Sequence, residues 1–223
     1  GNSSTNVLCL NGVAGNWASL LNQAAFAGAT QLDIKLRLTP STAFAAAVTA
    51  CAGDYFSTGN QRCWLAGFGN DGAGFPYLRI SGDGSTSQII SASAAVSYTA
   101  FNPFWLRITW RASDQRVQFF TAADQTIPPA AWTQLGTTRT MPGSIASLFD
   151  STALLGIGGI QNQGANENLP GNYNYFFAST TIDGAADVEV DFSAASKLAS
   201  SFVCSTGQTV TINTSGATGA RIS

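Results

Sequence analysis

The stretch QLDIKLRLTP (Gln31–Pro40) alternates apolar and polar side chains along its length and closes with a proline. Aliphatic residues occupy every second position, and the charged residues Asp33, Lys35 and Arg37 lie between them. Successive side chains of a β-strand point to opposite faces of the sheet, so this pattern predicts a strand with one apolar face. We expect that face to pack into a core and the charged face to meet solvent.

A second stretch, FWLRITWRASDQRVQFFTA (residues 104–122), predicts a hairpin. Apolar and polar residues alternate on both arms, and Ser113 and Asp114 supply the turn. Shorter strands, each bounded by Gly, Asn, Asp or Ser, are predicted in CWLAGFG, YLRISG, SQIISAS, ALLGIGGI and QTVTIN. Helical periodicity is scarce, with residues 17–26 the best candidate for a short helical turn or loop. Many short strands spaced by about 8–15 residues predict an all-β antiparallel β-sandwich or jelly roll.

The chain has 223 residues, a length that one β-sandwich can occupy, so residues 1–223 are expected to form a single domain. It is 45% hydrophobic but only 10% charged, against a usual charged share of about 25%. Serine, threonine, asparagine, glutamine and glycine must therefore supply the polar surface. This composition is more typical of an extracellular or virion protein than of a cytoplasmic enzyme.

The charge distribution argues against two kinds of partner. The net charge is −2 and the ten Lys and Arg residues are scattered, so no basic patch for nucleic acid is predicted. No apolar run reaches the roughly 18 residues that a membrane helix needs, so membrane insertion is not expected.

The chain contains no histidine. Ser-His-Asp and Cys-His catalysis, His-based zinc sites and imidazole proton shuttles are therefore excluded. One methionine and four cysteines also supply few sulfur ligands for a metal. Any chemistry must use carboxylates, hydroxyls, amides and aromatic faces.

The four cysteines show no CxxC spacing, which makes a zinc or thioredoxin-like site a weak interpretation. Cys51 and Cys63 flank a turn and can clip a hairpin through a disulfide. Cys9 and Cys204 lie near opposite ends of the chain and can pair only if the terminal strands are neighbours. The alternative, with equal weight, is that all four are buried thiols that pack as small hydrophobic residues.

Taken in order, several segments resemble the laminin-G-like, concanavalin A-like jelly roll of bacteriophage virion proteins. These segments are LCLNGVAGNWASL (residues 8–20), the strand at 31–40, the hairpin at 104–122 with its WTQLG tail, TTIDGAADVEVDFSAAS (180–196) and the closing CSTGQTVTINTSGATGARIS (204–223). The resemblance implies a jelly roll whose first and last strands are neighbours. It also implies a component of a virion, of the minor-tail or head-decoration type, located on the particle surface. The four cysteines and the Asn-rich insertion at 161–174 depart from the pattern of that group.

Three carboxylates, Asp187, Glu189 and Asp191, alternate in DVEVDF. Jelly-roll glucanases of the same superfamily carry Glu-x-Asp-x-Glu, so the spacing agrees but the residue types are inverted. Positions i and i+4 of a strand lie roughly 13 Å apart, whereas a retaining pair of carboxyl groups needs about 5–5.5 Å, which short Asp side chains do not reach easily. We therefore expect a solvated strand face, with the intervening apolar residues in the core, and no catalytic residue.

A calcium site is a minority interpretation of two Gly-rich turns. Asn70 and Asp71 in GNDGAG, with Asp83 in SGDGS, would supply oxygen ligands of the kind that calcium takes. Such turns are far more often plain hairpin loops, so no cofactor is expected.

The Asn-rich segment at residues 161–175 is the strongest candidate for an outside contact, because long loops in compact domains are usually functional or disordered. Its amides can hydrogen-bond sugar hydroxyls, and its tyrosines can pack on sugar rings or on a protein partner. Of the five tryptophans, Trp105 is the one expected to be exposed. The candidate binding residues are Asn162, Gln163, Asn166, Asn168, Asn172, Tyr173, Tyr175 and Trp105.

Two functions remain open at this point. The first is a non-enzymatic virion structural protein that contacts other virion proteins. The alternative is a glycan-binding adhesin that attaches the particle to a host-cell glycan. A glycoside hydrolase is a less favoured third hypothesis. A homo-oligomer is compatible with all three functions.

Overall fold

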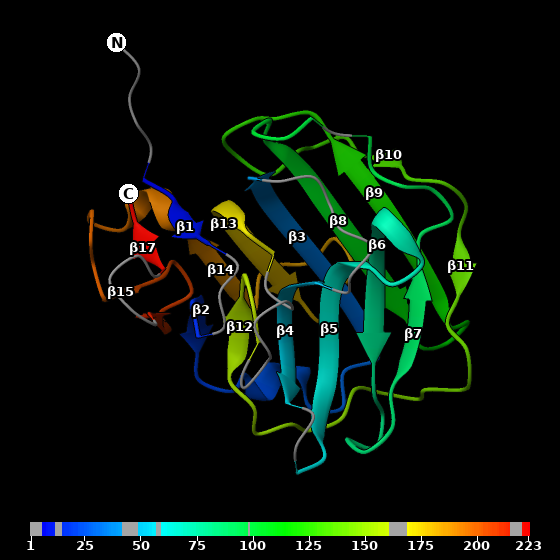
Figure 1. Ribbon diagram of the computed structural model, residues 1–223. Coiled ribbons are helices and arrows are strands. Elements are labelled where there is room, and N and C mark those ends of the chain that lie inside the picture. The colour runs from blue at the N-terminus through cyan, green and yellow to red at the C-terminus, as the bar shows by residue number, and fades with distance from the viewer. Residues whose placement is uncertain are drawn as a thin grey trace.

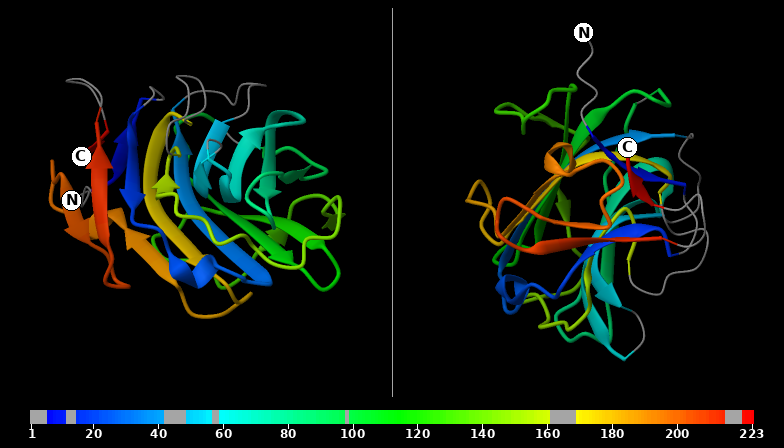
Figure 2. Two further views of the ribbon diagram at one scale, coloured as in Figure 1. Left: turned by 90° about the horizontal axis from the view of Figure 1, so that it is seen from below. Right: turned by 90° about the vertical axis from the view of Figure 1, so that its left-hand side faces the viewer.

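The computed structural model describes residues 6–11, 15–41, 49–56, 59–97, 99–160, 169–214 and 220–223. Within these ranges the chain forms two antiparallel sheets that stack as a β-sandwich (Figure 1). The predicted all-β sandwich is confirmed. Figure 2 shows the two layers from two further directions. No helix in the described ranges has the length and apolarity to cross a membrane.

The back sheet, which lies behind in Figure 1, has the strand order β10-β9-β8-β3-β13-β1-β17, with β11 also pairing β9 and β14 also pairing β13. Its strands are β1 (Leu8–Leu10), β3 (Gln31–Pro40), β8 (Phe104–Arg111), β9 (Arg116–Ala122), β10 (Thr133–Gln134), β11 (Arg139–Thr140), β13 (Gly171–Ser179), β14 (Val188–Asp191) and β17 (Arg221–Ile222).

The front sheet has the order β15-β16-β2-β12-β4-β5-β6-β7. Its strands are β2 (Trp17–Leu20), β4 (Thr49–Phe56), β5 (Gln61–Gly69), β6 (Gly72–Ile80), β7 (Gln88–Ser91), β12 (Leu155–Ile157), β15 (Ser201–Val203) and β16 (Thr209–Asn213). Two short 3₁₀ turns, η1 (Ala24–Phe26) and η2 (Phe192–Ala194), complete the described elements. The candidate helical segment at 17–26 thus begins as β2 and ends as η1.

The first and last strands are neighbours, as predicted. Strand β1 pairs with β17, with Leu8 opposite Ile222 and Cys9 opposite Arg221. The backbones of Val7 and Ser223 exchange two hydrogen bonds of 3.1 Å. The two ends of the chain therefore leave the sandwich from the same side (Figures 1 and 2).

Strand β3 has the alternation that its sequence predicts and lies in the middle of the back sheet, between β8 and β13. Its four aliphatic side chains face the core and are at most 1% exposed: Leu32, Ile34, Leu36 and Leu38. They meet the apolar faces of both neighbouring strands, since Leu36 is opposite Leu106 on one side and Phe176 on the other. Burying these side chains is the main favourable term in forming the sandwich.

The opposite face of β3 differs from the prediction, because its charges do not all meet solvent. Asp33 is fully buried and accepts hydrogen bonds of 2.8 Å from both Nε and Nη2 of Arg107 on β8. Arg107 also bonds Asp183 at 2.6 Å, and the backbone N–H of Asp183 donates to Asp33 at 3.1 Å. Lys35 lies 3.4 Å from the same carboxylate. The loop after β13 is thereby held over the outer face of the back sheet.

Cys51 and Cys63 do not form the predicted disulfide; both are free thiols on the neighbouring strands β4 and β5. The register sets Asp54 opposite Trp64, which displaces the two cysteines from each other along the ladder. Both side chains are fully buried, and burial raises the pKa of the Cys51 thiol to about 12. They pack as small apolar residues, as the alternative interpretation predicts.

The possible disulfide between Cys9 and Cys204, one of the two alternatives, is not formed either, because both thiols are free. Cys9 belongs to β1 of the back sheet, whereas Cys204 directly follows β15 of the front sheet. The sulfur of Cys9 lies 2.7 Å from the hydroxyl of Ser223, and that of Cys204 lies 3.2 Å from Oε1 of Gln208. The strand from the C-terminal part of the chain that pairs with β1 is β17, and not β15, which precedes Cys204.

Removing the buried Asp33 carboxylate tests how strongly the ion pair supports the fold. Asp33→Ala leaves the Arg107 guanidinium buried without its bidentate partner, so we expect the free energy of unfolding to fall by about 3–5 kcal/mol. The matched control is Asp114→Ala, which breaks the exposed pair with Arg111 and should cost at most about 1 kcal/mol. Urea unfolding of the two variants measures both values; equal losses would contradict the proposed importance of burial.

Asp54 is a second buried carboxyl group, only 1% exposed, and its Oδ1 has no hydrogen-bond partner within the described chain. Burial raises its pKa to about 7, and the nearby Asp150 adds to the effect. In the unfolded chain such a group ionises near pH 3.9. The native state therefore binds more protons than the unfolded state between about pH 4 and pH 7, which favours the native state at the acidic end of that window.

We accordingly expect the free energy of unfolding to decrease as the pH rises from about 4 to about 7, by on the order of 4 kcal/mol. Asp54→Asn should remove most of this slope, since the amide does not titrate. Asp150→Asn, at an exposed position, should keep most of it. Chemical unfolding at a series of pH values gives the slopes; identical slopes in the wild type and Asp54→Asn would refute the assignment.

Candidate functional site

The Asn-rich segment is described only in part. Asn162, Gln163, Asn166 and Asn168 lie outside the described residues. From Gly171 onward the segment is strand β13, which pairs with β1, β3 and β14. Asn172 is therefore part of a central strand and not of a loop. The alternation of side chains in GNYNYFFAS is the sequence signal that could have predicted this strand.

Tyr173 and Tyr175 are not exposed, contrary to the prediction. Tyr173 is 1% exposed in the core, where its hydroxyl donates to the carbonyl of Leu169 at 3.3 Å. Tyr175 is 6% exposed on the outer face and packs against Trp105, with ring centroids 5.3 Å apart. A register shift against β3 between the two tyrosines sends them to opposite faces of the sheet. Neither ring is free to contact a partner.

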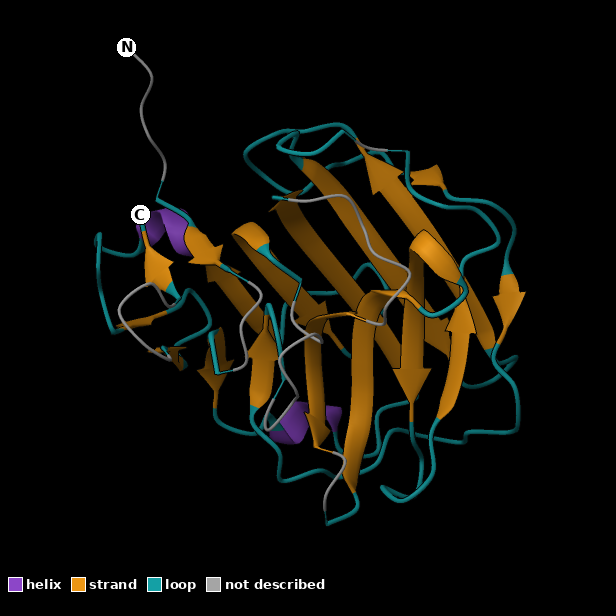
Figure 3. Cartoon of the chain, in the orientation of Figure 1, coloured by secondary structure: helices purple, strands orange, loops and turns teal. Residues whose placement is uncertain are grey.

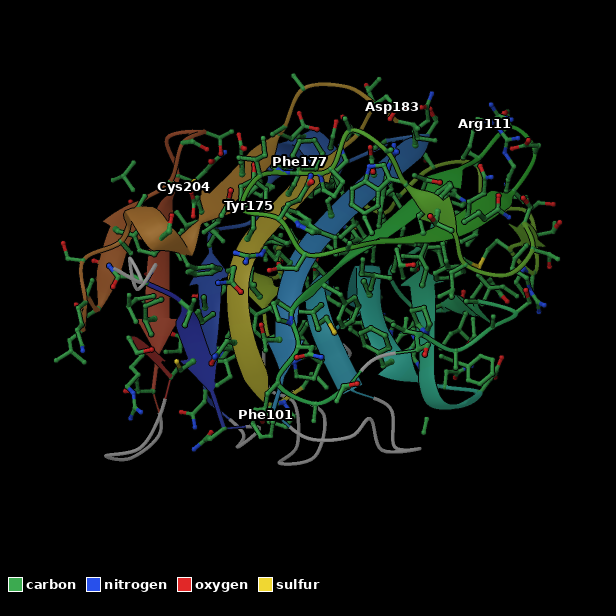
Figure 4. All side chains as sticks on the ribbon, turned by 90° about the horizontal axis from the view of Figure 1, so that it is seen from above. Phe101, Arg111, Tyr175, Phe177, Asp183 and Cys204 are labelled. Atoms are coloured by element: carbon green, nitrogen blue, oxygen red, sulfur yellow. The ribbon has the colours of Figure 1, made fainter. Side chains whose placement is uncertain are left out.

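Trp105 is fully buried, so its predicted exposure is also wrong. Alternation correctly places it on the outer face of β8, but the chain after β9 folds over that face. Trp132 packs edge-on against Trp105, with ring centroids 6.2 Å apart, and the indole N–H of Trp105 donates to the carbonyl of Gln125 at 2.9 Å. Figure 4 shows Tyr175 and Phe177 on the same side of the molecule as Asp183.

The carboxylates of DVEVDF lie on the outer face at β14, and the residues between them fill the core, as predicted: Val188, Val190 and Phe192 are fully buried. Asp187 accepts hydrogen bonds of 2.7 and 2.8 Å from the backbone and hydroxyl of Thr180. Asp191 accepts one of 2.9 Å from the backbone N–H of Ser193 and so caps η2. These two carboxylates therefore stabilise local turns.

The candidate calcium ligands do not come together. Asn70 and Asp71 lie in the turn before β6, whereas Asp83 follows the far end of this strand. Nine residues of extended chain separate the two turns by roughly 30 Å. Among the described residues, no group of three or more Cys, Asp or Glu side chains is placed to hold a metal ion.

A feature that the sequence reasoning missed lies at the end of the sandwich where β3 ends and β8 begins. Phe101 is 71% exposed and has a φ of +68°, a left-handed conformation that residues other than glycine, asparagine and aspartate rarely adopt. Its backbone N–H donates to the carbonyl of Pro40 at 3.0 Å. Figure 4 shows its side chain at the margin of the molecule, away from Tyr175 and Phe177. An aromatic residue before Asn-Pro was the available signal.

A pocket of about 250 Å³ lies at the segment that contains Phe101, although Phe101 itself is not one of its lining residues. Hydroxyl, amide and apolar groups line it: Ser97, Thr99, Asn102, Pro103 and Phe104. The backbone N–H of Asn102 donates to the carbonyl of Thr99 at 3.0 Å and closes the turn that carries Phe101. We call Phe101 and these five residues the Phe101 pocket.

The Phe101 pocket lies beside the described flank of the Asn-rich segment. The backbone N–H of Ser41 donates to the carbonyl of Pro170 at 3.2 Å, and the preceding Pro40 accepts the bond from Phe101. The chain at residues 169–170 and the turn that carries Phe101 are therefore anchored to the same end of β3.

At the opposite end of the sandwich, residues 141–151 form a segment that we call the strap. It belongs to the loop between β11 and β12, which passes below the strands in Figure 3. Two shallow pockets, of about 350 and 430 Å³, meet at Ala146 on the strap. No local sequence pattern indicates these pockets, because their walls come from segments far apart in the chain.

No family model matches the chain, and no curated protein matches its sequence. Solved structures do share its fold. A Bacteroides ovatus protein to which carbohydrate binding is provisionally attributed has a TM-score of 0.63 at 9% identity, over 98% of this chain and 59% of that one. The heptameric SAP-like pentraxin of Limulus polyphemus has a TM-score of 0.53 at 15% identity, over 93% and 94%. Domains LG4–5 of the mouse laminin α1 chain have a TM-score of 0.55 at 10% identity, over 89% and 49%.

At these identities the likeness shows the fold alone. It confirms the jelly-roll part of the sequence resemblance, since the neighbours are laminin-G-like and pentraxin sandwiches. It gives no support to the bacteriophage part. The chain also spans only about three fifths of the Bacteroides ovatus protein and half of the laminin chain.

The strained backbone at Phe101 leads to a prediction about stability. Asparagine adopts the left-handed region more readily than phenylalanine, and the exposed ring contributes little to the core. Phe101→Asn should therefore raise the free energy of unfolding, by about 1 kcal/mol. Urea unfolding measures the change, and a loss of stability would show that the ring supports the fold.

Proposed function

We propose that this chain is a non-enzymatic glycan-binding module and that the Phe101 pocket holds the sugar. The observation that carries the proposal is an aromatic ring kept in solvent on a strained backbone. Strained residues persist where the surrounding structure holds them in place, and they cluster at functional sites. The ring gives the fold little in return, so its value is expected to lie in contact with another molecule.

The chemistry of the Phe101 pocket suits a saccharide. One face of a pyranose ring presents C–H groups, which pack on the electron-rich face of an aromatic ring. The sugar hydroxyls at its rim both donate and accept hydrogen bonds. The hydroxyls of Ser97 and Thr99 can do both, and the amide of Asn102 offers donors and an acceptor. A flat apolar platform beside a few polar groups is the usual arrangement of a small-ligand site.

The absence of catalysis is part of the proposal. Two of the three acidic residues that the sequence offers for glycoside hydrolysis, Asp187 and Asp191, are engaged in turns. Asp54 is buried beneath the surface of the front sheet. These positions support binding without hydrolysis.

We further propose that the module is located on the surface of a virion. The order of sequence segments supports that location, and so does a surface built from neutral polar residues. There the module would attach the particle to a glycan of its host. The competing role, a structural decoration of the particle, predicts that particles with an altered Phe101 adsorb to cells normally.

Phe101→Ala tests the proposed function. Loss of a central aromatic contact typically costs about 2 kcal/mol, or roughly thirtyfold in affinity. We expect a loss of this size for the isolated domain on a printed array of bacterial oligosaccharides. The control is Ile127→Ala, which removes an equally exposed apolar side chain (69%) elsewhere. Binding that is unchanged in Phe101→Ala, or lost equally in both variants, would contradict the proposal.

A further inference from the structure

The two pockets at the strap share Ala146 as a lining residue. The larger of the two, about 430 Å³, lies on the back-sheet side and is lined by Thr30, Gln31, Arg111, Ala112, Ser113 and Ala146. The other, about 350 Å³, lies on the front-sheet side and is lined by Gly82, Asp83, Thr86, Gln88 and residues 143–147. We call the combined feature the strap groove. Its size is within the range of small-ligand sites.

Hydrogen bonds to both sheets fix the strap in place. The side-chain amide of Gln115 donates to the carbonyl of Ile145 at 2.8 Å and accepts from its N–H at 3.2 Å. The N–H of Leu148 donates to the carbonyl of Ala29 at 2.8 Å, and that of Phe149 donates to Ser81 at 2.9 Å. Hydrogen bonds to Gln115 and Ala29 thus hold the strap on the side of the back sheet, and the bond to Ser81 holds it on the side of the front sheet. The walls of the groove are therefore formed before any ligand arrives.

Two glycines lie where the loop after β6 meets the strap. A β-carbon at Gly82 would lie 3.2 Å from the carbonyl oxygen of Ser147 and 3.3 Å from a methyl group of Ile145, which is tighter than ordinary contact. Gly143 has a φ of +75°, in the left-handed region that favours glycine. A side chain at Gly82 would require the strap to shift by a few tenths of an ångström, and one at Gly143 would strain the backbone.

Several polar side chains of the strap groove make no hydrogen bond within the described part of the chain. The amide of Gln88 and the hydroxyls of Ser144 and Ser147 make no hydrogen bond within the described part of the chain. On the other side of Ala146, the hydroxyls of Thr30 and Ser113 are likewise unpaired there. Groups of this kind are available to a ligand at no cost to the internal hydrogen bonds.

Asp83 differs from these groups because it is held in one orientation. Its Oδ1 accepts from the backbone N–H groups of Thr86 and Ser85 at 2.8 and 2.9 Å, and its Oδ2 accepts from the hydroxyl of Thr86 at 2.7 Å. The hydrogen bonds from Thr86, with those from Ser85, hold the pKa of this carboxyl well below its ordinary value. The carboxylate is therefore ionised and retains lone pairs that can accept from hydroxyl donors.

We propose that the strap groove is a second saccharide-binding site, which takes neutral sugars through their hydroxyl groups. The fixed carboxylate of Asp83 accepts from a pair of sugar hydroxyls, and the amide of Gln88 and the hydroxyl of Ser144 complete the contact. An anionic ligand is disfavoured on this side of Ala146, where the charged lining residue is acidic. The site stands on its own observations and does not depend on the Phe101 pocket.

The two sites lie at opposite ends of β3, because the strap groove includes Gln31 and the Phe101 pocket adjoins Pro40. Ten residues of strand separate them by roughly 33 Å. One module can therefore contact two separated points of a polysaccharide or two neighbouring chains. Simultaneous contact raises the overall affinity without any new contact at either site.

The experiment uses the double variant Gln88→Ala/Ser144→Ala on the same printed array of bacterial oligosaccharides. Neither side chain makes an internal hydrogen bond within the described residues, so the fold should be unaffected, as thermal unfolding will verify. The matched control is Asn22→Ala/Ser193→Ala, which removes an amide and a hydroxyl elsewhere that also lack such bonds. Asp83 is left intact because it shapes its own loop.

We expect Phe101→Ala to keep a residual signal on neutral array saccharides, and we expect that signal to fall at least tenfold when Gln88→Ala/Ser144→Ala is added. A groove variant that matches the wild type and the control on every saccharide overturns the second site and leaves the Phe101 proposal standing. The reverse result, in which only the groove variant loses binding, overturns the Phe101 proposal instead. A groove that binds added calcium and no saccharide, or a preference for acidic sugars, also overturns the inference.

Discussion

The buried pair between Asp33 and Arg107 is the interaction on which the rest of the structure depends. In a chain with few charges, it places a carboxylate and a guanidinium on the face of β3 and β8 that simple alternation assigns to solvent. Such a pair is costly to bury and is tolerated only when its hydrogen bonds are satisfied. Asp183 meets that need and brings the loop after β13 over the sheet. The ring of Phe177 extends the cover, with Lys35 3.9 Å above it. The back sheet is thus packed on both faces in its middle.

The two ends differ in how they are prepared for a ligand. At one end the turn that carries Phe101 holds an apolar ring in solvent on a strained backbone. The free energy of contact with a ligand would offset the cost of that strain. At the other end the strap is tied to both sheets, and its groove offers unpaired hydroxyls and an oriented carboxylate. The first arrangement suits the apolar face of a sugar and the second suits its hydroxyl groups. The same central strand, β3, sets the distance between them.

The sequence was sufficient for features that depend on local alternation. It identified β3, the hairpin of β8 and β9, and the apolar residues of β14, because a strand that buries one face must repeat with a period of two. Alternation also placed Trp105 on the correct face of its strand. It failed to predict the burial of Trp105 and Tyr175, since what lies over a face is decided by loops distant in sequence. The strap groove shows the same limit: Gly82, Gly143 and Thr30 carry no common pattern and meet only after the sandwich has closed. The cysteine pairing failed for a related reason, as spacing along the chain does not reveal register across a ladder.

The pairing of β1 with β17 has a mechanical consequence for a module tethered by its ends. The backbones of Val7 and Ser223 are bonded at the point where the two strands begin and end. Tension applied between the two ends would therefore act on that pair first and open the ladder one bond at a time, as in a zipper. Tension that enters through one end and leaves through a bound sugar at Phe101 takes another route, across the body of the sandwich through β3. The sandwich should therefore resist tension better when the load enters through a single end of the chain than when it acts between the two ends.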